Sequence, residues 1–191
     1  MCIYYEEMPI QAVCERVHRY KVGGASLNCI NFTVTMNPCP CGYYPDKSRC
    51  RCTPFEIHNY LSHISGPILD RIDLCVDAPR VEIGQIRDGK KGESSERMRK
   101  KVMTARSRQR ERYQGTSIRF NSQLSAGEIE QYCQLGKGEK EMLEKLFASF
   151  HLSVRAYHKL LKVARSIADL EESGQVLRKH LQEAACYQVR D

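Results

Sequence analysis

The C-terminal half of the chain places apolar residues at the spacing of amphipathic helices. The widest apolar stripe follows Ser153 and comprises Val154, Tyr157, Leu160, Leu161, Ala164, Ile167 and Ala168. Further helical patterns follow Ser94 or Ser95, Glu139 and Leu177, and the stretch from Ser125 to Glu128 is a capping-box pattern. The pattern therefore predicts an all-helical domain over residues 96–191.

The first third of the chain has a mixed pattern. Met8–Val17 carries apolar residues at helical spacing, whereas Cys29–Thr35 is β-branched and apolar, as in a buried strand. Thr53, followed by proline, predicts the start of a helix, and Leu74–Ala78 alternates as a second strand does. We expect an α/β unit here.

Residues 84–95 separate the two patterns. Their sequence, GQIRDGKKGESS, is rich in glycine and charge and offers no apolar side chain for a core beyond one isoleucine. We expect a linker over 84–95, which divides the chain into an N-terminal unit, residues 1–83, and the helical domain.

Composition is ordinary for a globular protein of 191 residues, with 41% apolar and 28% charged residues. No apolar run approaches the roughly 20 residues that a transmembrane helix needs. The first residues, MCIYYEEMPIQ, lack the basic and apolar regions of a signal peptide. These features predict a cytoplasmic protein with no membrane partner.

The charge is concentrated in one segment. The chain has a formal net charge of +7, and the stretch from Arg87 to Arg119 holds twelve basic and four acidic residues. Such a segment attracts polyanions, nucleic acid first. A solvated helix face is the alternative interpretation, and the sequence leaves both open.

Four of the ten cysteines lie close together, as Cys-Pro-Cys, eight further residues and Cys-Arg-Cys. Four thiolates complete a tetrahedral site for zinc, and such a site is structural because no position stays open for water. The ligands would be Cys39, Cys41, Cys50 and Cys52. Basic neighbours at 47, 49 and 51 would offset the thiolate charge. Free thiols or an opportunistic disulfide are the alternatives.

Four longer motifs resemble one family. MNPCPCGYY, CRCTP, ISGPILDRIDL and SVRAYHKLLKVARSIADL together resemble the C-terminal half of the magnesium-chelatase-like AAA+ ATPases of the YifB/ComM type, from about Arg19 to the end. The resemblance implies an α/β fragment of an AAA+ core over residues 1–83, with a cysteine-rich insertion over 38–53. An all-α helical lid domain would follow over 96–191.

The resemblance also assigns roles to three polar residues. Asn37, at a strand end, matches sensor 1, Arg71 in LDRID matches the arginine finger that acts in a neighbouring subunit, and Arg155 matches sensor 2 of the lid. Each residue type also has a plain structural explanation. Asn37 precedes proline and suits a turn, Arg71 could pair with Asp70 or Asp73, and Arg155 could be an exposed first-turn residue.

The family's phosphate loop and acidic Walker B strand are not found in this sequence. No Gly-x-x-x-x-Gly-Lys-Ser/Thr pattern occurs in it. ATP and Mg²⁺ would therefore need a further, N-terminal part, and the chain alone should neither bind nor hydrolyse ATP appreciably.

The resemblance favours the C-terminal part of a motor that forms a homo-oligomeric, hexameric ring and acts on DNA. Competence-type members of the family are associated with DNA branch migration. A free-standing, zinc-stabilised, basic nucleic-acid-binding module without catalysis is the first alternative. An ATPase subunit of magnesium chelatase, acting in tetrapyrrole synthesis, is the second.

Overall fold

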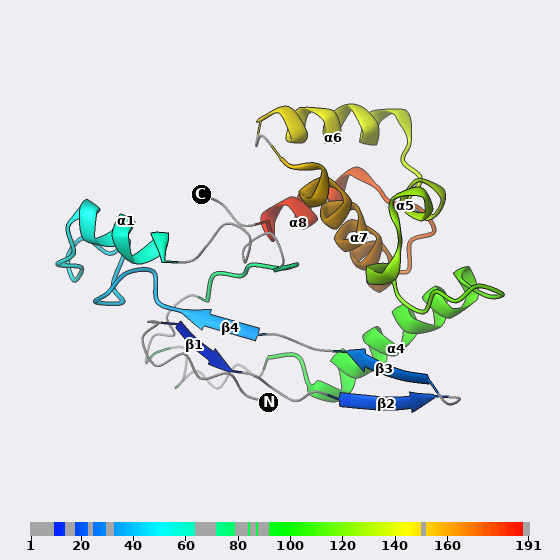
Figure 1. The fold of residues 1–191 in the computed structure, drawn as a ribbon, viewed down its shortest axis with the longest axis horizontal. Helices are drawn as coiled ribbons and strands as arrows, with labels where there is room; N and C mark the ends of the chain where they lie inside the picture. Colours follow the sequence, from blue (N-terminus) through cyan, green and yellow to red (C-terminus); the bar gives the residue numbers. More distant parts are fainter. Residues whose placement is uncertain are drawn as a thin grey trace. The chain divides into compact units, whose positions relative to one another are not determined.

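The computed structural model describes residues 10–13, 18–22, 25–29, 33–63, 72–78, 84, 87, 92–149 and 152–188. The chain divides into two compact units, Met1–Gly66 and Pro67–Asp191. Helices predominate over strands in the residues described (Figure 1). None of the described helices is long and apolar enough to cross a membrane.

The strands of the first unit form two antiparallel pairs. Strand β1 (Ile10–Val13) pairs with β4 (Thr33–Met36), and β2 (His18–Val22) pairs with β3 (Ala25–Cys29). In these pairs Ile10 lies opposite Met36, and Val22 lies opposite Ala25. The α/β core of the AAA+ type predicted for residues 1–83 stays a prediction, because two separate pairs do not make up such a sheet.

One expectation for this unit was wrong, and a second falls partly outside the described residues. Ile10–Val13, placed in a helix by its spacing, is strand β1, because its backbone groups pair with β4, twenty or more residues away in the sequence. Of the strand expected over Cys29–Thr35, the described residues place Cys29 at the end of β3 and residues 33–35 in β4, and residues 30–32 lie outside the described residues.

Helix α1 (Pro54–Ser62) begins as the sequence predicts. Thr53 is the N-cap, and its Oγ1 accepts a hydrogen bond from the Glu56 backbone N–H at 3.2 Å. The Glu56 carboxylate accepts the Thr53 backbone N–H at 2.7 Å in return, so the capping box is complete. Pro54 takes the first helical position, where no backbone N–H is needed.

The second unit is a helical bundle around α7. Its elements are α4 (Ser95–Arg112), the 3₁₀ turn η1 (Asn121–Gln123), α5 (Ala126–Tyr132), α6 (Lys137–Ser149), α7 (Val154–Leu170) and α8 (Arg178–Cys186). Helix α7 is central, and its Leu160, Ala164 and Ala168 are at most 1% exposed (Figure 1). The helical domain predicted from the apolar stripes is thus present.

Local signals set the ends of these helices. The Ser153 Oγ accepts the Ala156 N–H at 3.1 Å and starts α7, and the Ser125–Glu128 capping box starts α5. The strand predicted over Leu74–Ala78 is wrong, because these residues form no strand and belong to no sheet in the described structure. The Cys75 N–H donates instead to the Tyr187 carbonyl at 2.9 Å.

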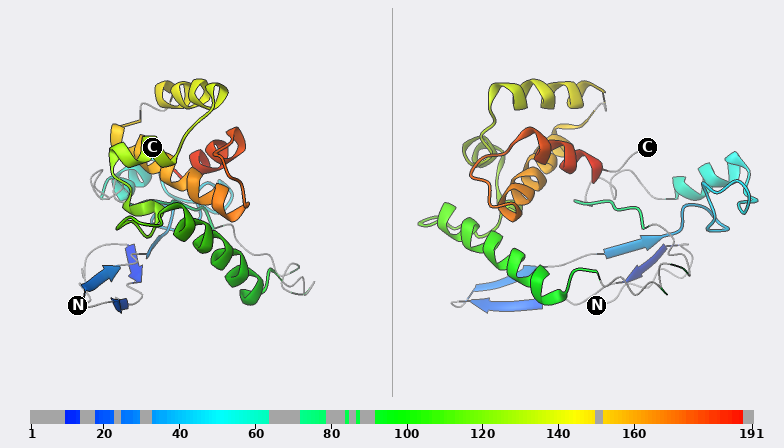
Figure 2. Two further views of the ribbon diagram at one scale, coloured as in Figure 1. Left: turned by 90° about the vertical axis from the view of Figure 1, so that its right-hand side faces the viewer. Right: turned by 180° about the vertical axis from the view of Figure 1, so that it is seen from behind.

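A buried carboxylate ties α4 to α7. Asp169 is fully buried and accepts from Arg112 Nη1 at 2.9 Å, from Asn121 Nδ2 at 3.0 Å and from Arg165 Nη2 at 3.1 Å. The second guanidinium nitrogen of Arg112 also contacts this carboxylate. The C-terminal half of α4 is therefore fixed to the bundle, whereas residues 95–103 are exposed and α4 runs out beyond α7 (Figure 2).

Candidate functional site

The four clustered cysteines converge in the first unit. The Cys39 Sγ lies 3.3 Å from the Cys41 Sγ and 3.8 Å from the Cys50 Sγ, and 3.6 Å separates Cys41 from Cys50. With Cys52, all four sulfur atoms lie within 4.8 Å of one another. The structure thus brings together the complete set of metal ligands predicted from the sequence.

Short-range turns close this segment, which we call the cysteine loop (Cys39–Cys52). Gly42 has a φ of +74°, a left-handed conformation that glycine adopts without strain, and its N–H donates to the Cys39 carbonyl at 2.9 Å. The Cys50 N–H donates to the Asp46 carbonyl at 2.8 Å. These turns return the chain so that the second cysteine pair faces the first.

The sulfur positions fit a zinc ion. Zn–S bonds of about 2.3 Å in a tetrahedron place the sulfur atoms about 3.8 Å apart, close to the separations observed. Cys39 is fully buried and the other three cysteines are half-buried, as expected for ligands around a central ion. Side chains at 47, 49 and 51 carry positive charge beside a site whose four thiolates and Zn²⁺ would sum to about −2.

Backbone donors favour the thiolate form of the first cysteine pair. Hydrogen bonds from the backbone of Arg51 and Tyr43 lower the pKa of Cys41 to about 6. Burial raises the pKa of Cys39, but backbone hydrogen bonds, among them Tyr44 N–H to Cys39 Sγ at 3.4 Å, outweigh it and leave the pKa lowered. Thiolates are the form that binds metal, so this pair is prepared for ligation.

Asn37 lies directly after β4 and beside the cysteine loop. Its side chain is exposed, and its atoms lie 3.6–3.7 Å from the position that a Cβ at Gly42 would occupy. A polar residue just past a strand agrees with both interpretations of Asn37, the sensor and the turn. Its role as sensor 1 stays a prediction.

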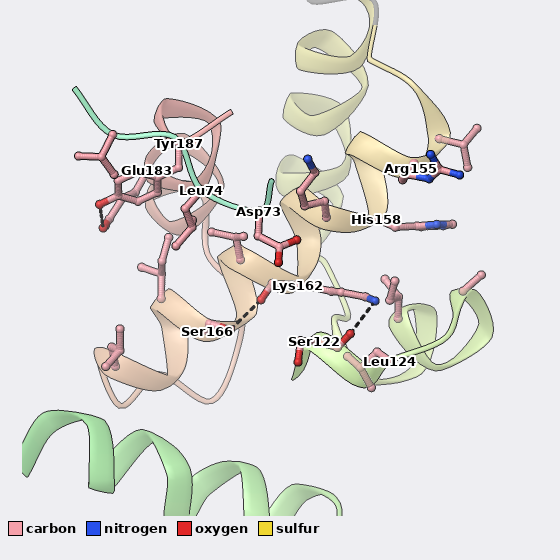
Figure 3. A pocket seen from close by; sticks show the side chains of 18 residues that line it. Asp73, Leu74, Ser122, Leu124, Arg155, His158, Lys162, Ser166, Glu183 and Tyr187 are labelled. Atoms are coloured by element: carbon pink, nitrogen blue, oxygen red, sulfur yellow. Dashed lines mark hydrogen bonds between the residues drawn. The ribbon is translucent and has the colours of Figure 1, made fainter. Parts of the chain in front are cut away.

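Arg155 is the second residue of α7 and is exposed. It belongs to the second unit, whereas Asn37 belongs to the first. Figure 3 shows Arg155 and His158 projecting to the same side of α7, with Lys162 further along the helix. Arg71, the predicted arginine finger, lies outside the described residues, and so does Asp70.

A groove of about 1020 Å³ runs along this side of α7, and we call it the α7 groove. Apolar side chains, among them Leu124, Ile129, Val163, Ile167 and Leu170, line it together with four basic ones, Arg155, His158, Lys159 and Lys162. The Lys162 Nζ donates to the Ser122 carbonyl at 3.0 Å, and the Lys159 Nζ donates to the Ile72 carbonyl at 2.7 Å.

Of these four basic residues, only Arg155 was predicted from the sequence as a site residue. The signal for the others was available, because positions 155, 158, 159 and 162 follow the three- and four-residue spacing of one helix face. The groove itself could not be predicted from the sequence, since residues from the segments 73–76, 122–129 and 183–187 also line it.

Two family models match the chain one after the other. The model described as magnesium chelatase, subunit ChlI, matches residues 9–86, and the model for the C-terminal domain of that subunit matches residues 92–188. Together they cover the cysteine loop, Asn37, Arg71 and the helical bundle around Arg155.

Individual relatives agree with the family models. The chain is 41% identical to YifB of Salmonella typhimurium over 159 residues, which is 83% of this chain and 30% of that protein. It is 41% identical to the competence protein ComM of Haemophilus influenzae over 157 residues, 82% of this chain and 30% of that one. An uncharacterised protein of Mycobacterium tuberculosis is 32% identical over 137 residues, 72% of this chain and 27% of its own length.

The chain thus spans about 30% of the length of the first two relatives. The two family matches include the cysteine motifs as well as the helical domain. The chain belongs to the magnesium-chelatase-like family of the YifB/ComM type.

Proposed function

We propose that this chain supplies the sensor residues and the helical lid of an AAA+ ATPase of the YifB/ComM type. The observation that carries the proposal is the succession of two magnesium-chelatase family matches, over residues 9–86 and 92–188. Because the sequence contains no phosphate loop, ATP and Mg²⁺ would be held by residues other than those of this chain.

The domain organisation follows from this assignment. Residues 1–83 would complete the α/β core and include the cysteine-rich insertion over 38–53, residues 84–95 would be the linker, and residues 96–191 would form the lid. The two family matches meet between residues 86 and 92, which supports a boundary inside that linker.

In this assignment Asn37, Arg71 and Arg155 all act at the γ-phosphate end of a nucleotide site. Asn37 would position the attacking water, Arg155 would contact the nucleotide of its own subunit, and Arg71 would reach the nucleotide of the neighbouring subunit. Phosphoryl transfer is catalysed mainly by positioning and charge stabilisation, for which a guanidinium is well suited. The position of Arg155 in the first turn of α7 supports its role, because the helix N-terminus also favours an anion.

The zinc ion would be structural. Cys39, Cys41, Cys50 and Cys52 would occupy all four of its positions, and the ion would hold the turns of the cysteine loop together. It would leave no site for a substrate or for water, so it takes no part in ATP hydrolysis.

The partners would be further copies of the chain, arranged in a hexameric ring, and DNA. Exposed arginines at 99, 106 and 110 lie along one face of α4, and we call them the α4 stripe. At 1.5 Å per residue the stripe is about 16 Å long, enough to follow two or three phosphates of a DNA strand. No salt-bridge partner of these three arginines is present among the described residues.

A chimera tests the ATPase proposal. The matched segment of Salmonella typhimurium YifB would be replaced by this chain, and ATP hydrolysis would be measured with and without Arg155→Ala. We expect hydrolysis in the parent chimera and a loss of at least about tenfold in the variant, because one phosphate contact of the transition state is removed. Arg178→Ala is the matched control, since Arg178 is also an exposed arginine in the first turn of a helix.

The second candidate function is a basic nucleic-acid-binding module without catalysis. The exposed α4 stripe and the lack of a phosphate loop in this sequence favour it. A chimera that folds and assembles but hydrolyses no ATP, with DNA binding by the chain alone, would replace the first proposal by this one.

A further inference from the structure

The cysteine loop carries two adjacent tyrosines on its surface. Tyr43 is 37% exposed and Tyr44 is 46% exposed. The Arg49 guanidinium lies over the Tyr43 ring, 5.1 Å from its centroid, and the side chain of Arg51 is exposed as well. Two aromatic rings and two arginines therefore lie within one short segment.

Hydrogen bonds fix the backbone at both tyrosines. The Tyr43 carbonyl accepts the Asp46 N–H at 2.9 Å, and the Tyr44 N–H donates to the Cys39 Sγ at 3.4 Å. Asp46 is itself fixed, since its Oδ1 accepts from the Ser48 N–H at 3.0 Å and from the Ser48 hydroxyl at 2.6 Å. The loop thus presents its rings from a pre-organised backbone, which lowers the entropy lost when a ligand stacks on them.

We propose that the cysteine loop binds single-stranded nucleic acid, with bases stacked on Tyr43 and Tyr44 and with Arg49 and Arg51 directed at the neighbouring phosphates. Unstacked bases offer a flat π-face, and aromatic and guanidinium planes are the protein groups that stack on it. This inference deepens the proposed function by naming the form of nucleic acid that the loop contacts, and it rests on that proposal only for the nature of the partner.

Charge predicts how this contact responds to salt. Lys47, Arg49 and Arg51 against Asp46 give the loop +2, which about cancels the −2 of four thiolates with Zn²⁺. Affinity for the loop therefore comes mostly from stacking, and with only two phosphate contacts it falls less with salt than binding to the α4 stripe. The α4 stripe has no such compensation, so its binding of phosphates falls steeply with salt.

The test uses the full chain, purified with zinc, and fluorescence anisotropy at about 150 mM salt, where phosphate contacts are screened. The probes are a fluorescein-labelled oligothymidylate of about 20 nucleotides and an abasic oligomer with the same number of phosphates. We expect the oligothymidylate to bind at least about tenfold more tightly than the abasic strand.

Tyrosine variants locate the effect. Tyr43→Ala with Tyr44→Ala should remove the preference for the strand with bases, and the double Phe variant should keep it because stacking needs the ring and not the hydroxyl. Phe55→Ala is the control, since Phe55 is 77% exposed in the same unit but outside the loop. Zinc content, measured on every variant, reports whether the loop is still formed.

Three results would overturn the inference. They are equal binding of the two probes, an unchanged preference in the zinc-bound alanine variant, and loss of the preference in a zinc-bound phenylalanine variant. If the alanine variant loses zinc, the inference is still tested by the phenylalanine variant and by the comparison of the two probes on the wild-type chain. If the chimera hydrolyses no ATP but the chain still prefers the oligothymidylate to the abasic strand, the ATPase proposal is rejected and this inference is kept.

Discussion

Asp169→Ala is the substitution whose effect the structure determines most closely. The Asp169 carboxylate is fully buried in the helical unit and faces two guanidinium groups. The Arg165 side chain is 3% exposed and the Arg112 side chain is 16% exposed, so neither can turn to water without breaking the packing of α4 on α7. Alanine would leave two buried cations facing each other without their shared anion.

Removing one partner of a buried ion pair costs about 3–5 kcal/mol. A domain of this size has a free energy of unfolding of about 5–15 kcal/mol, so the loss is a large share of the total. It corresponds to a melting temperature lowered by about 15–30 °C for a unit of roughly 100 residues. The Asp169→Asn variant keeps an acceptor oxygen, so its free energy of unfolding should lie between those of Asp169→Ala and the wild type.

Urea unfolding, followed by circular dichroism at the helical band, measures this loss. The matched control is Glu111→Ala, because Glu111 is an exposed acid beside Arg112 on α4 and should change stability by no more than about 0.5 kcal/mol. An Asp169→Ala variant within about 1 kcal/mol of the wild type would refute the buried ion network as the tie between α4 and α7.

Three further predictions follow from the same structure. Elemental analysis should find one zinc per chain, and the double variant Cys39→Ser with Cys50→Ser should contain none. Freshly purified protein without stoichiometric metal would refute the zinc assignment. Arg99→Ala, Arg106→Ala and Arg110→Ala together should weaken duplex DNA binding and flatten its decline between about 50 and 200 mM salt, whereas an unchanged slope would assign the α4 stripe to solvation. Burial alone would raise the pKa of the Asp169 carboxyl, but hydrogen bonds from Arg112 and Asn121 lower it. The ionised carboxylate therefore contributes its full share of the folding stability above about pH 4, and this share is lost as the pH falls further. In thermal melts at decreasing pH, the melting temperature of the Asp169→Asn variant should fall less than that of the wild type.

Features set by near neighbours in the sequence were predictable. Thr53 and Ser153 start helices because the side-chain oxygen of each accepts the backbone N–H three residues ahead, and at the start of α5 the Glu128 carboxylate accepts the Ser125 N–H at 2.7 Å. The cysteine cluster was predictable for the same reason, since its ligands lie within fourteen positions and short turns bring them together.

Features that depend on residues distant in the sequence could not be predicted. Ile10–Val13 became a strand because β4 supplied its hydrogen bonds, which local spacing does not encode. The ion network was also missed, although Arg165 and Asp169 stand four residues apart within the apolar stripe of α7, where a charge needs a buried partner. Arg112, 57 residues from Asp169, could only be assigned from the fold.

The central claim is that this chain completes ATP sites built by other parts of an oligomer, and mixing two inactive chimeras tests it most directly. One chimera carries Arg71→Ala, and the other carries an inactivated phosphate loop in its Salmonella typhimurium YifB portion. If Arg71 acts in the neighbouring subunit, an equal mixture should regain about a quarter of the parent's ATP hydrolysis, because that fraction of sites pairs an intact phosphate loop with an intact arginine. A mixture that assembles into rings and stays as inactive as its components would contradict the account.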